Sequence, residues 1–532
     1  MKRFNTAGPC IPTRHYMVDI SERVRQIRKM VDNGDYFCMN RGRQYGKTTT
    51  IAALERELCE DYLVISLDFQ QLGSEEFVDE NTFANAFVTV LQLELSMSPQ
   101  VTPDILATLD QMLESAESDR YRLLRLFVDL GRIISSSQRP IVLIIDEVDS
   151  ASNNQVFLDF LAQLRLQYLR RAKNLRVPAF QSVILAGVTD IRHLRSKIRD
   201  EDQHKVNSPW NIAVEFAVDM DLSVDGIQGM LADYESDHAT EMDAAAVAQA
   251  IREYTHGYPF LVSRICQIMD QKLVGNGFVN LSEAWTVRGV DEAVRIILSE
   301  TNTLFDSLMG KLQNYLELRI QLRALLMRGE SIACVPDDVE QQQLLMYGFV
   351  RVEHNKLVVA NRVFEMRLYV FFVGESERNS SLKRDADLSR GAFVTADGGL
   401  DVPKIMDHFI RAHNRIHGQS SPRFLEEEAR ERFLTYISPI INGTGTYSVE
   451  EQTRDQRRMD VVIHWLGRRY VVELKVWRGE RYHEEGEQQI VGYLDYFGLS
   501  TGYLLSFDFR NRKVPGVRRV HVGERVLFEG TV

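Results

Sequence analysis

The sequence has few cysteines, and they follow no recognisable pattern. Five cysteines are scattered over 532 residues, with no Cys-x-x-Cys pair and no spacing typical of a zinc site. They are Cys10, Cys38, Cys59, Cys266 and Cys334. A disulfide scaffold is therefore not indicated, and we expect reduced thiols in a cytoplasmic protein.

Long apolar runs and a positive net charge are missing as well. No run reaches the roughly 18 residues of a membrane span, and the opening residues MKRFNTAGPC lack the apolar stretch of a secretory signal. We therefore expect no membrane partner. The net charge of −12 argues against a generally basic protein that coats nucleic acid, but not against a local basic groove in one domain.

The composition is that of an ordinary globular protein, and the chain is long enough for about 3–4 domains. Between residues 19 and 220, apolar runs alternate with helical patterns. The runs are YFCMN (36–40), YLVISLDF (62–69), IVLIIDEV (141–148) and SVILAG (182–187). Because each run is continuously apolar, the pattern predicts an α/β doubly wound fold, a parallel sheet with helices on both faces.

Residues 223–373 predict helices that end in a hairpin. A turn punctuated by Gly257 and Pro259 separates two helical patterns. Near the end of the segment, a polar turn at Glu353–Lys356 lies between two β-rich runs. This order is typical of a winged helix.

Residues 374–400 lose their apolar periodicity, and we expect a linker over 374–420. In the final segment, 421–532, a helix over 422–438 precedes the strand–turn–strand signal MDVVIHWLGRRYVVELKVW. The chain is therefore expected to divide into 1–222, 223–373, a linker and a C-terminal domain.

The stretch NRGRQYGKTTT, residues 40–50, nearly matches the phosphate-loop pattern G-x-x-x-x-G-K-[ST]. Gly46 allows close backbone approach, Lys47 supplies positive charge, and the Thr48 hydroxyl can hold magnesium. Arg41 stands where the first glycine is expected, and Gly42 comes one residue late. A strand before the loop and a helix after it favour phosphate binding. The alternative is a turn that kept this shape without a nucleotide.

A second motif, IVLIIDEVDS, places two acids at the end of a predicted strand. At the carboxyl edge of a parallel sheet, Asp146 can order magnesium-bound water beside the phosphate loop. Glu147 can then act as the base that polarises the attacking water. The alternative is a solvated acidic strand end.

Five ordered blocks within residues 1–370 together resemble the AAA-like P-loop ATPases of prokaryotes, which are relatives of the archaeal-ATPase and STAND groups. The blocks are RGRQYGKTT, LIIDEVD, LAGVTDIRHLR, VNSPWNIAVEF and HGYPFLVSRIC. In these groups an arginine commonly begins the loop. The resemblance implies an ATPase core over 1–222, a helical lid and winged helix over 223–373, and ATP with Mg²⁺ as cofactors. The implied nucleotide-binding residues are Arg41, Gly42, Gly46, Lys47, Thr48, Thr49 and Asp146, with Thr48 and Asp146 at the metal.

The same resemblance puts Thr189 and Asp190 at sensor positions after the last strand. Arg192 or Arg195 would reach the γ-phosphate, although an ordinary surface helix explains these arginines equally well.

A second constellation lies in the predicted C-terminal hairpin. Asp460 opens the first strand, and the sequence YVVELKVW forms the return strand after a turn at Gly467–Arg468. Alternation with period two puts Glu473 and Lys475 on one face of that strand. We expect Tyr470 on their face and a cleft in front of them.

Asp460 and Glu473 can bind a divalent metal through oxygen ligands, and Lys475 can position or activate the attacking water. The spacing D-x(12)-E-L-K resembles the PD-(D/E)xK nuclease superfamily, with Met459 in place of its proline. Downstream, Gln489 and Tyr493 form a Q-x-x-x-Y pair that resembles the RecB-type branch. The resemblance implies catalytic residues Asp460, Glu473, Lys475 and Gln489, and metal ligands Asp460, Glu473 and Glu428.

The glutamate that completes this metal site has alternatives, because Glu427 and Glu431 lie on the same predicted helix as Glu428. The competing interpretation of the whole constellation is a salt-bridged Glu–Lys pair on an exposed strand face. The neighbouring arginines either track phosphates or belong to a solvated hairpin. They are Arg454, Arg457, Arg458, Arg468, Arg469, Arg478 and Arg481.

Together, the two sites indicate an ATP-regulated nuclease of the prokaryotic cytoplasm that cuts nucleic acid, more readily DNA than RNA, with Mg²⁺ or Mn²⁺ at the nuclease site. The resemblance suggests defence against phage or mobile DNA, and homo-oligomers fit such a protein. The alternative is a nucleotide-dependent switch or scaffold whose nuclease-like domain binds nucleic acid or a partner without cutting. A DNA motor is disfavoured, because no helicase motif set is present.

Overall fold

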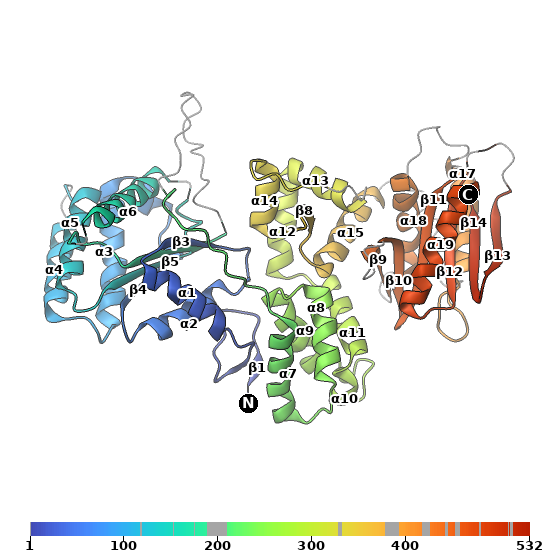
Figure 1. Ribbon diagram of the computed structural model, residues 1–532, viewed down its shortest axis with the longest axis horizontal. Coiled ribbons are helices and arrows are strands. Elements are labelled where there is room, and N and C mark those ends of the chain that lie inside the picture. Colours follow the sequence, from blue (N-terminus) through green and yellow to red (C-terminus); the bar gives the residue numbers. More distant parts are fainter. Residues whose placement is uncertain are drawn as a thin grey trace. The chain divides into compact units, whose positions relative to one another are not determined.

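The structure is a computed structural model (Figure 1). It describes residues 2–116, 120–152, 154–174, 176–188, 210–327, 332–377, 393–417, 426–441, 445–452, 458–477, 480–508, 510 and 514–532. The chain divides into two compact units. The first unit contains Met1–Arg252, His256–Gln267 and Gln342–Gly348, and the second contains Glu253–Thr255, Ile268–Gln341 and Phe349–Val532.

A four-stranded parallel sheet forms the centre of the first unit, in the order β3-β6-β5-β4. The strands are β3 (Tyr36–Asn40), β4 (Leu63–Asp68), β5 (Ile141–Asp146) and β6 (Ser182–Gly187). The central strands β5 and β6 are apolar and buried along nearly their whole length. At the edge, β4 instead alternates between buried and half-buried residues. The predicted α/β parallel fold is confirmed.

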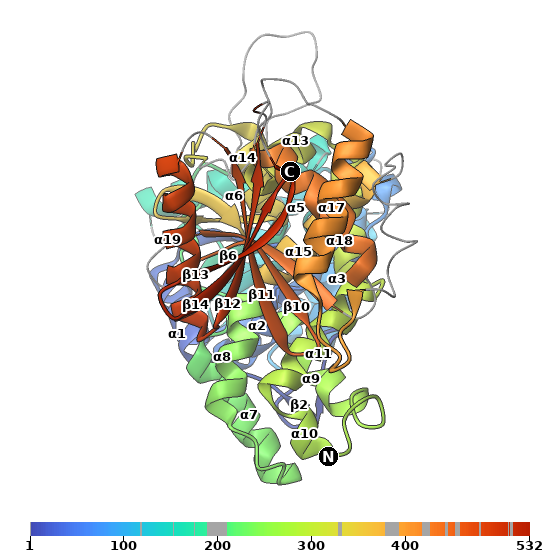
Figure 2. The ribbon, with the colours of Figure 1, turned by 90° about the vertical axis from the view of Figure 1, so that its right-hand side faces the viewer.

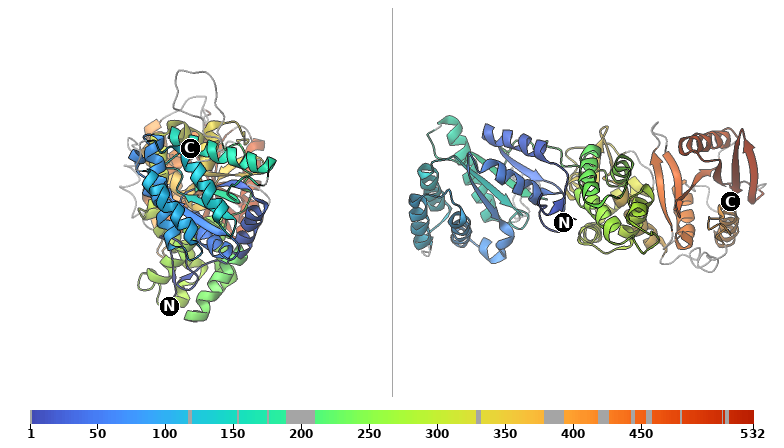
Figure 3. Two further views of the ribbon diagram at one scale, coloured as in Figure 1. Left: turned by 90° about the vertical axis from the view of Figure 1, so that its left-hand side faces the viewer. Right: turned by 90° about the horizontal axis from the view of Figure 1, so that it is seen from below.

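Helices cover both faces of this sheet, as Figure 3 shows. One face packs against α1 (Ser21–Asn33) and α2 (Lys47–Leu58), which form an apolar core with Val142 and Ile144 of β5. The other face packs against a second core of phenylalanines and leucines. Its helices are α3 (Glu80–Met97), α4 (Pro103–Ala116), α5 (Leu123–Ser136) and α6 (Gln155–Lys173). Fully burying one such side chain stabilises the fold by about 1.5–3 kcal/mol.

Short elements complete the first unit. The strands β1 (Arg3–Phe4) and β2 (His15–Tyr16) pair in parallel, and β2 contacts α7 (Val224–His238). Two 3₁₀ turns, η1 (Phe69–Gln71) and η2 (Ser74–Phe77), follow β4. The helices α8 (Ala244–Thr255) and α9 (Pro259–Gln271) meet at the predicted turn, where His256 and Gly257 both have left-handed backbones.

The second unit begins with a group of helices and a hairpin. The helices are α10 (Leu281–Ala284), α11 (Val287–Ser299), α12 (Thr303–Asn314), α13 (Leu316–Met327) and α15 (Arg362–Glu377). α14 (Val339–Tyr347) follows α13, and its residues from Gln342 onward belong to the first unit. The hairpin pairs β7 (Val350–Glu353) with β8 (Lys356–Val359). His354 and Asn355 have positive φ, as a two-residue hairpin turn requires. The hairpin lies where the winged-helix pattern predicts it.

A six-stranded mixed sheet follows, in the order β13-β14-β12-β11-β10-β9. Its strands are β9 (Gly445–Gln452), β10 (Arg458–Trp465), β11 (Arg468–Val476), β12 (Thr501–Phe507), β13 (Gly516–Val522) and β14 (Arg525–Thr531). β11, β12 and β14 run parallel, and the other pairings are antiparallel. α19 (Glu480–Phe497) lies on one face of the sheet, and α17 (Val402–His417) and α18 (Glu426–Ile441) lie on the other (Figure 2).

The prediction of a linker over 374–420 is wrong for its second half, because α17 belongs to the C-terminal sheet. Phe409 of α17 packs edge-on against Phe433 of α18 and against Phe507 of β12. The segment before α17 is also held to the sheet. Trp465 donates an indole hydrogen bond to the carbonyl of Gly398, at 2.9 Å. The segment has a low overall hydrophobicity because α17 is apolar on one side only, and for this reason the helix was not predicted.

Within the described residues, no helix is long and apolar enough to cross a membrane. All five cysteines belong to the described part of the chain, and no disulfide joins them there.

Candidate functional site

The predicted phosphate loop lies between the end of β3 and the start of α2, at the carboxyl edge of the parallel sheet. Gly46 precedes the helix with a left-handed backbone at φ 80°, and Gln44 is also left-handed at φ 57°. The first backbone N–H groups of α2 have no partners within the helix and carry the positive end of its dipole. This arrangement suits an anion at the loop.

Lys47 is buried at the base of the loop, with only 7% of its surface exposed. Its ammonium donates hydrogen bonds to the carbonyls of Arg41, at 3.0 Å, and Gly42, at 3.1 Å. Burial lowers the pKa of Lys47, while the carboxylates of Glu147, Asp149 and Asp146 oppose that shift. The loop therefore concentrates a cation at the site where phosphate charge would lie.

Thr48 and Asp146 come together beside the lysine. The exposed Thr48 hydroxyl donates a hydrogen bond to Oδ2 of Asp146, at 3.3 Å. Asp146 ends β5 and is paired in register with Asp68, which ends β4. Burial raises the pKa of Asp146. A hydroxyl and a carboxylate in this position are oxygen ligands that suit Mg²⁺.

Glu147 follows with an unusual backbone. Its φ of 54° is left-handed, a conformation that is strained for a residue with a side chain and that clusters at functional sites. Its N–H donates to Oδ1 of Asp146, at 2.9 Å. Burial raises the pKa of Glu147, and the nearby Lys47 partly offsets this rise. A carboxylate with a raised pKa is suited to accept a proton.

Two side chains expected at the nucleotide have other partners. The Arg41 guanidinium donates to the carbonyls of Asn40 and Val218, at 3.0 and 3.1 Å, and lies over the Phe216 ring. The Thr49 hydroxyl accepts a hydrogen bond from the N–H of Cys10, at 3.0 Å. One residue further along a helix turns the side chain by about 100°, so Thr49 faces away from Thr48. These two side chains support the loop.

Asp149 and Tyr258 also contact this site, and neither was predicted from the sequence. Oδ2 of Asp149 accepts the N–H of Val188, at 2.7 Å, just after β6. The acid pattern DEVD carried a signal for Asp149. Tyr258 donates its hydroxyl hydrogen bond to the carbonyl of Arg43 within the loop, and only the aromatic residue in HGYPF hinted at it. The expected sensor residues lie outside the described residues. They are Thr189, Asp190, Arg192 and Arg195.

Residues 13–370 match the family described as AAA-like domain, over more than half of the chain. The chain belongs to the AAA-like domain family. This membership confirms the predicted nucleotide-binding, P-loop ATPase type for this part of the AAA-like protein.

Three similar proteins cover between 50% and 69% of this AAA-like chain. The uncharacterized WD repeat-containing protein slr0143 of Synechocystis sp. is 24% identical over 271 residues, 50% of this chain. The chain spans only 21% of the length of that relative. Among solved structures, the Walker-type ATPase PABY2304 of Pyrococcus abyssi is 13% identical, with a TM-score of 0.44, and covers 69% of this chain and 99% of its own. The ORC1 protein of Aeropyrum pernix, solved in complex with DNA, is 11% identical, with a TM-score of 0.30, and covers 68% and 94%.

The C-terminal Glu–Lys pair is largely buried, and a helix packs over it. Lys475 Nζ lies 3.1 Å from Oε1 of Glu473, and their side chains are 15% and 2% exposed. Glu473 is paired in register with Leu504 of β12, which packs against Ile490 and Leu494 of α19. α19 therefore covers the face that carries the Glu–Lys pair.

The predicted Q-x-x-x-Y helix does face that pair. Tyr493 of α19 packs against Val462 of β10 and Val471 of β11, which are paired across the hairpin. A Cβ built at Gly486 would lie 3.5 Å from Cγ of Lys475. The half-buried Gln489 stands three residues after Gly486 and four before Tyr493, on the same stripe of the helix.

Asp460 is placed by its backbone alone, since its side chain lies outside the described part. It lies in β10 one residue before Val461, which pairs with Val472. Extending this register by one residue sets position 460 beside position 473. Glu428 is exposed on α18, which covers the opposite face of the sheet. The structure therefore does not place Glu428 on the face of Glu473.

The expectation that Tyr470 shares the face of Glu473 is wrong, because an odd separation of three residues reverses the face of a strand. The Tyr470 hydroxyl accepts the N–H of Leu400, at 2.9 Å, on the side of α17. Arg468, expected to track phosphates, instead pairs with Asp397 at 2.7 Å. Arg454, Arg457 and Arg478 lie outside the described residues, as do the side chains of Arg458 and Arg481.

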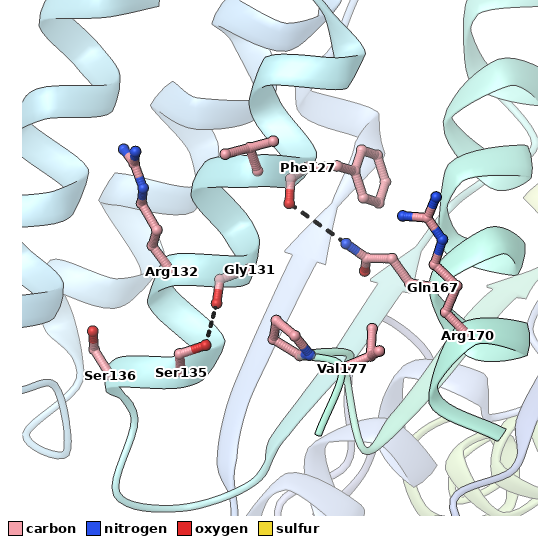
Figure 4. A pocket seen from close by; sticks show the side chains of 10 residues that line it. Phe127, Gly131, Arg132, Ser135, Ser136, Gln167, Arg170 and Val177 are labelled. Atoms are coloured by element: carbon pink, nitrogen blue, oxygen red, sulfur yellow. Dashed lines mark hydrogen bonds between the residues drawn. The ribbon is translucent and has the colours of Figure 1, made fainter. Parts of the chain in front are cut away.

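Among the described residues, no group of three or more His, Cys, Asp or Glu side chains could hold a metal. A pocket of about 490 Å³ lies between α5 and α6 (Figure 4). Phe127, Gly131 and Pro178 contribute apolar lining, and Arg132 and Arg170 contribute charge. This pocket shares no lining residue with the phosphate loop.

Proposed function

We propose that the first unit binds and hydrolyses ATP at the phosphate loop. The observation that carries this proposal is the group formed by Lys47, Thr48 and Asp146 at one edge of the parallel sheet. The residues present fit Mg²⁺-ATP: the loop offers a buried cation, and a hydroxyl lies 3.3 Å from a carboxylate oxygen. At Gly46 even an added Cβ would have no atom closer than 3.8 Å, so the backbone is open to close approach.

Each residue has a role in this proposal. Lys47 balances the charge of the terminal phosphates, and the amides of the loop orient them. Thr48 and Asp146 would hold Mg²⁺, which neutralises charge that develops on the phosphate oxygens. Glu147 accepts a proton from the attacking water, helped by its raised pKa.

We further propose that the C-terminal sheet carries a metal-dependent nuclease under the control of the ATPase. The support is the shared face of Glu473, Lys475 and Gln489, with position 460 beside Glu473 in the register. Of the predicted metal ligands, Glu473 is the one whose described side chain lies on this face. A metal bound there would therefore need Asp460 as a second ligand. The resemblance to the PD-(D/E)xK superfamily favours DNA as substrate and defence against phage or mobile DNA as the setting. Homo-oligomers remain part of this proposal.

A scaffold is the second candidate function, and the burial of Glu473 favours it. A carboxylate that is 2% exposed and ion-paired at 3.1 Å can serve the fold alone. In that case the C-terminal domain would bind nucleic acid or a partner without cutting, and ATP would switch its state.

One cleavage assay separates the two candidates. Plasmid, single-stranded DNA and RNA are incubated with the protein and Mg²⁺ or Mn²⁺, with and without ATP, and products are followed on gels. ATP-dependent release of fragments is expected for a nuclease. ATP hydrolysis without cleavage of any substrate would favour the scaffold.

A further inference from the structure

Three consecutive carbonyls of the phosphate loop are held by side-chain donors. The Lys47 ammonium takes those of Arg41 and Gly42, at 3.0 and 3.1 Å, and the Tyr258 hydroxyl takes that of Arg43. In a planar trans peptide the N–H of the next residue points opposite to the carbonyl. A donor that fixes the Arg43 carbonyl therefore also fixes the direction of the Gln44 N–H.

Tyr258 is firmly built into its position. It is 2% exposed, and its ring meets the Tyr45 ring edge-on with centroids 4.5 Å apart. Tyr45 in turn donates its hydroxyl to the carboxylate of Asp221. The loop thus has two aromatic contacts with the segments that follow the sheet.

The backbone of Tyr258 belongs to the start of α9. Its carbonyl accepts the N–H of Val262, at 3.0 Å, in the first turn of that helix. The preceding Gly257 accepts the N–H of Leu222, at 2.9 Å. Tyr258 therefore links the direction of the Gln44 N–H in the loop to the position of α9.

We propose that Tyr258 is a positioning residue for the phosphate loop and couples nucleotide binding to α9. This proposal rests on nucleotide binding at the loop. The tyrosine compensates for the missing first glycine. A glycine lets the backbone of a phosphate loop adopt the required conformation freely, whereas here the Tyr258 hydroxyl holds the Arg43–Gln44 peptide in its orientation. By linkage, a nucleotide that needs this orientation must also stabilise the start of α9.

The test is Tyr258→Phe, which keeps the ring and removes the hydroxyl. ATP affinity is measured by titration calorimetry, and amide hydrogen exchange over residues 259–267 is measured with and without saturating ATP. We expect roughly 3- to 10-fold weaker ATP binding, as for the loss of one net hydrogen bond. We also expect ATP to slow exchange in α9 of the parent protein and to do so less in the variant. A purely structural tyrosine would change the exchange without ATP and leave the effect of ATP intact.

Tyr254→Phe is the matched control, since its hydroxyl bonds Asp291 at 2.9 Å, away from the loop; parental ATP affinity is expected for it. If Tyr258→Phe does not fold, Tyr45→Phe keeps the ring contact, removes the hydrogen bond from the Tyr45 hydroxyl to Asp221, and should weaken ATP binding as well. Parental affinity together with a parental effect of ATP on α9 would overturn the positioning role alone. Failure of the parent protein to bind ATP would overturn the nucleotide proposal too.

Discussion

At the scale of single residues, the burial of Lys47 sets the chemistry of the first unit. Lys47 is only 7% exposed, so its ammonium has lost most of its hydration. The carboxylates of Glu147, Asp149 and Asp146 interact with it electrostatically. Such a buried ammonium interacts with a phosphate more strongly than a lysine on the surface does.

Lys47→Ala is expected to weaken ATP binding. Losing a charge-assisted contact costs roughly 1.5–3 kcal/mol, or about 10- to 150-fold in affinity. Calorimetric titration with ATP measures the effect, and Lys29→Ala on the exposed side of α1 is the control for charge. Equal affinity in the variant and the parent would contradict the phosphate-loop assignment.

Glu147→Gln is expected to spare ATP binding and slow hydrolysis by about 100-fold or more, because an amide has a similar shape but cannot act as a base. Phosphate release and ATP affinity are measured on the same preparation. The exposed Glu60→Gln serves as the control. Hydrolysis at the parental rate would mean that another residue is the base.

The residues of this site could be predicted only where local pattern decides their position. The spacing of Gly46, Lys47 and Thr48 fixes them at a helix start, and a strand end fixes Asp146. The partners of Arg41 and Thr49 come from residues 218 and 10. Such contacts between distant parts of the chain leave no mark in a short motif.

At the scale of elements, the turn between α8 and α9 depends on close backbone approach. Gly257 has φ 77°, and a Cβ there would lie 2.3 Å from the carbonyl oxygen of Leu222. The left-handed backbone disfavours a side chain at this position, and the contact with Leu222 leaves no room for one. The sequence predicted this turn from its glycine and proline, but it could not show which part of the chain approaches it.

Gly257→Ala should destabilise the first unit markedly. The left-handed backbone alone costs roughly 1–2 kcal/mol for alanine, and the overlap with Leu222 adds to that cost. Gly8→Ala is the matched control, because Gly8 has φ 68° and a Cβ added there would have no atom within 4 Å. Thermal unfolding of both variants gives the comparison. An equal fall in melting temperature would show that the close approach contributes nothing.

Segment 374–420 shows why an element can escape sequence analysis. Its apolar residues are few, but α17 concentrates them on the side that meets the sheet, at Met406, Phe409 and Ile410. The segment before it is polar, and its order comes from hydrogen bonds to Trp465 and Tyr470. Periodicity detects a helix that is apolar over several turns, and it misses loops that are held by their partners.

At the scale of the whole molecule, the question is whether one chain carries both ATP hydrolysis and metal-dependent cleavage of nucleic acid. We expect Asp460→Ala and Lys475→Ala each to abolish metal-dependent cleavage and leave ATP hydrolysis largely intact. Asp460→Ala should abolish cleavage by weakening Mg²⁺ binding, whereas Lys475→Ala should abolish it with the metal still bound. Cleavage and phosphate release are measured in parallel on each variant.

The burial of the pair calls for a second variant. Removing only Lys475 leaves a buried carboxylate without its ion-pair partner, which costs a few kcal/mol and can unfold the domain. The double variant Glu473→Gln, Lys475→Met removes both charges and should stay folded. If it cuts nucleic acid at the parental rate, the catalytic assignment is wrong and the pair is structural.

The first unit is assembled from three separate stretches of sequence, the last of which is Gln342–Gly348. Tyr347 in that stretch lies against Gly42 of the phosphate loop, 3.3 Å from where a Cβ would be. A ribosome makes the chain from its N-terminus at about 5–20 residues per second. After Gln267 has been synthesised, roughly 80 more residues must follow before Gln342–Gly348 can pack against the loop. At that rate the delay is about 4–16 seconds. During synthesis, the nucleotide site is therefore completed late, well after its own sheet can form.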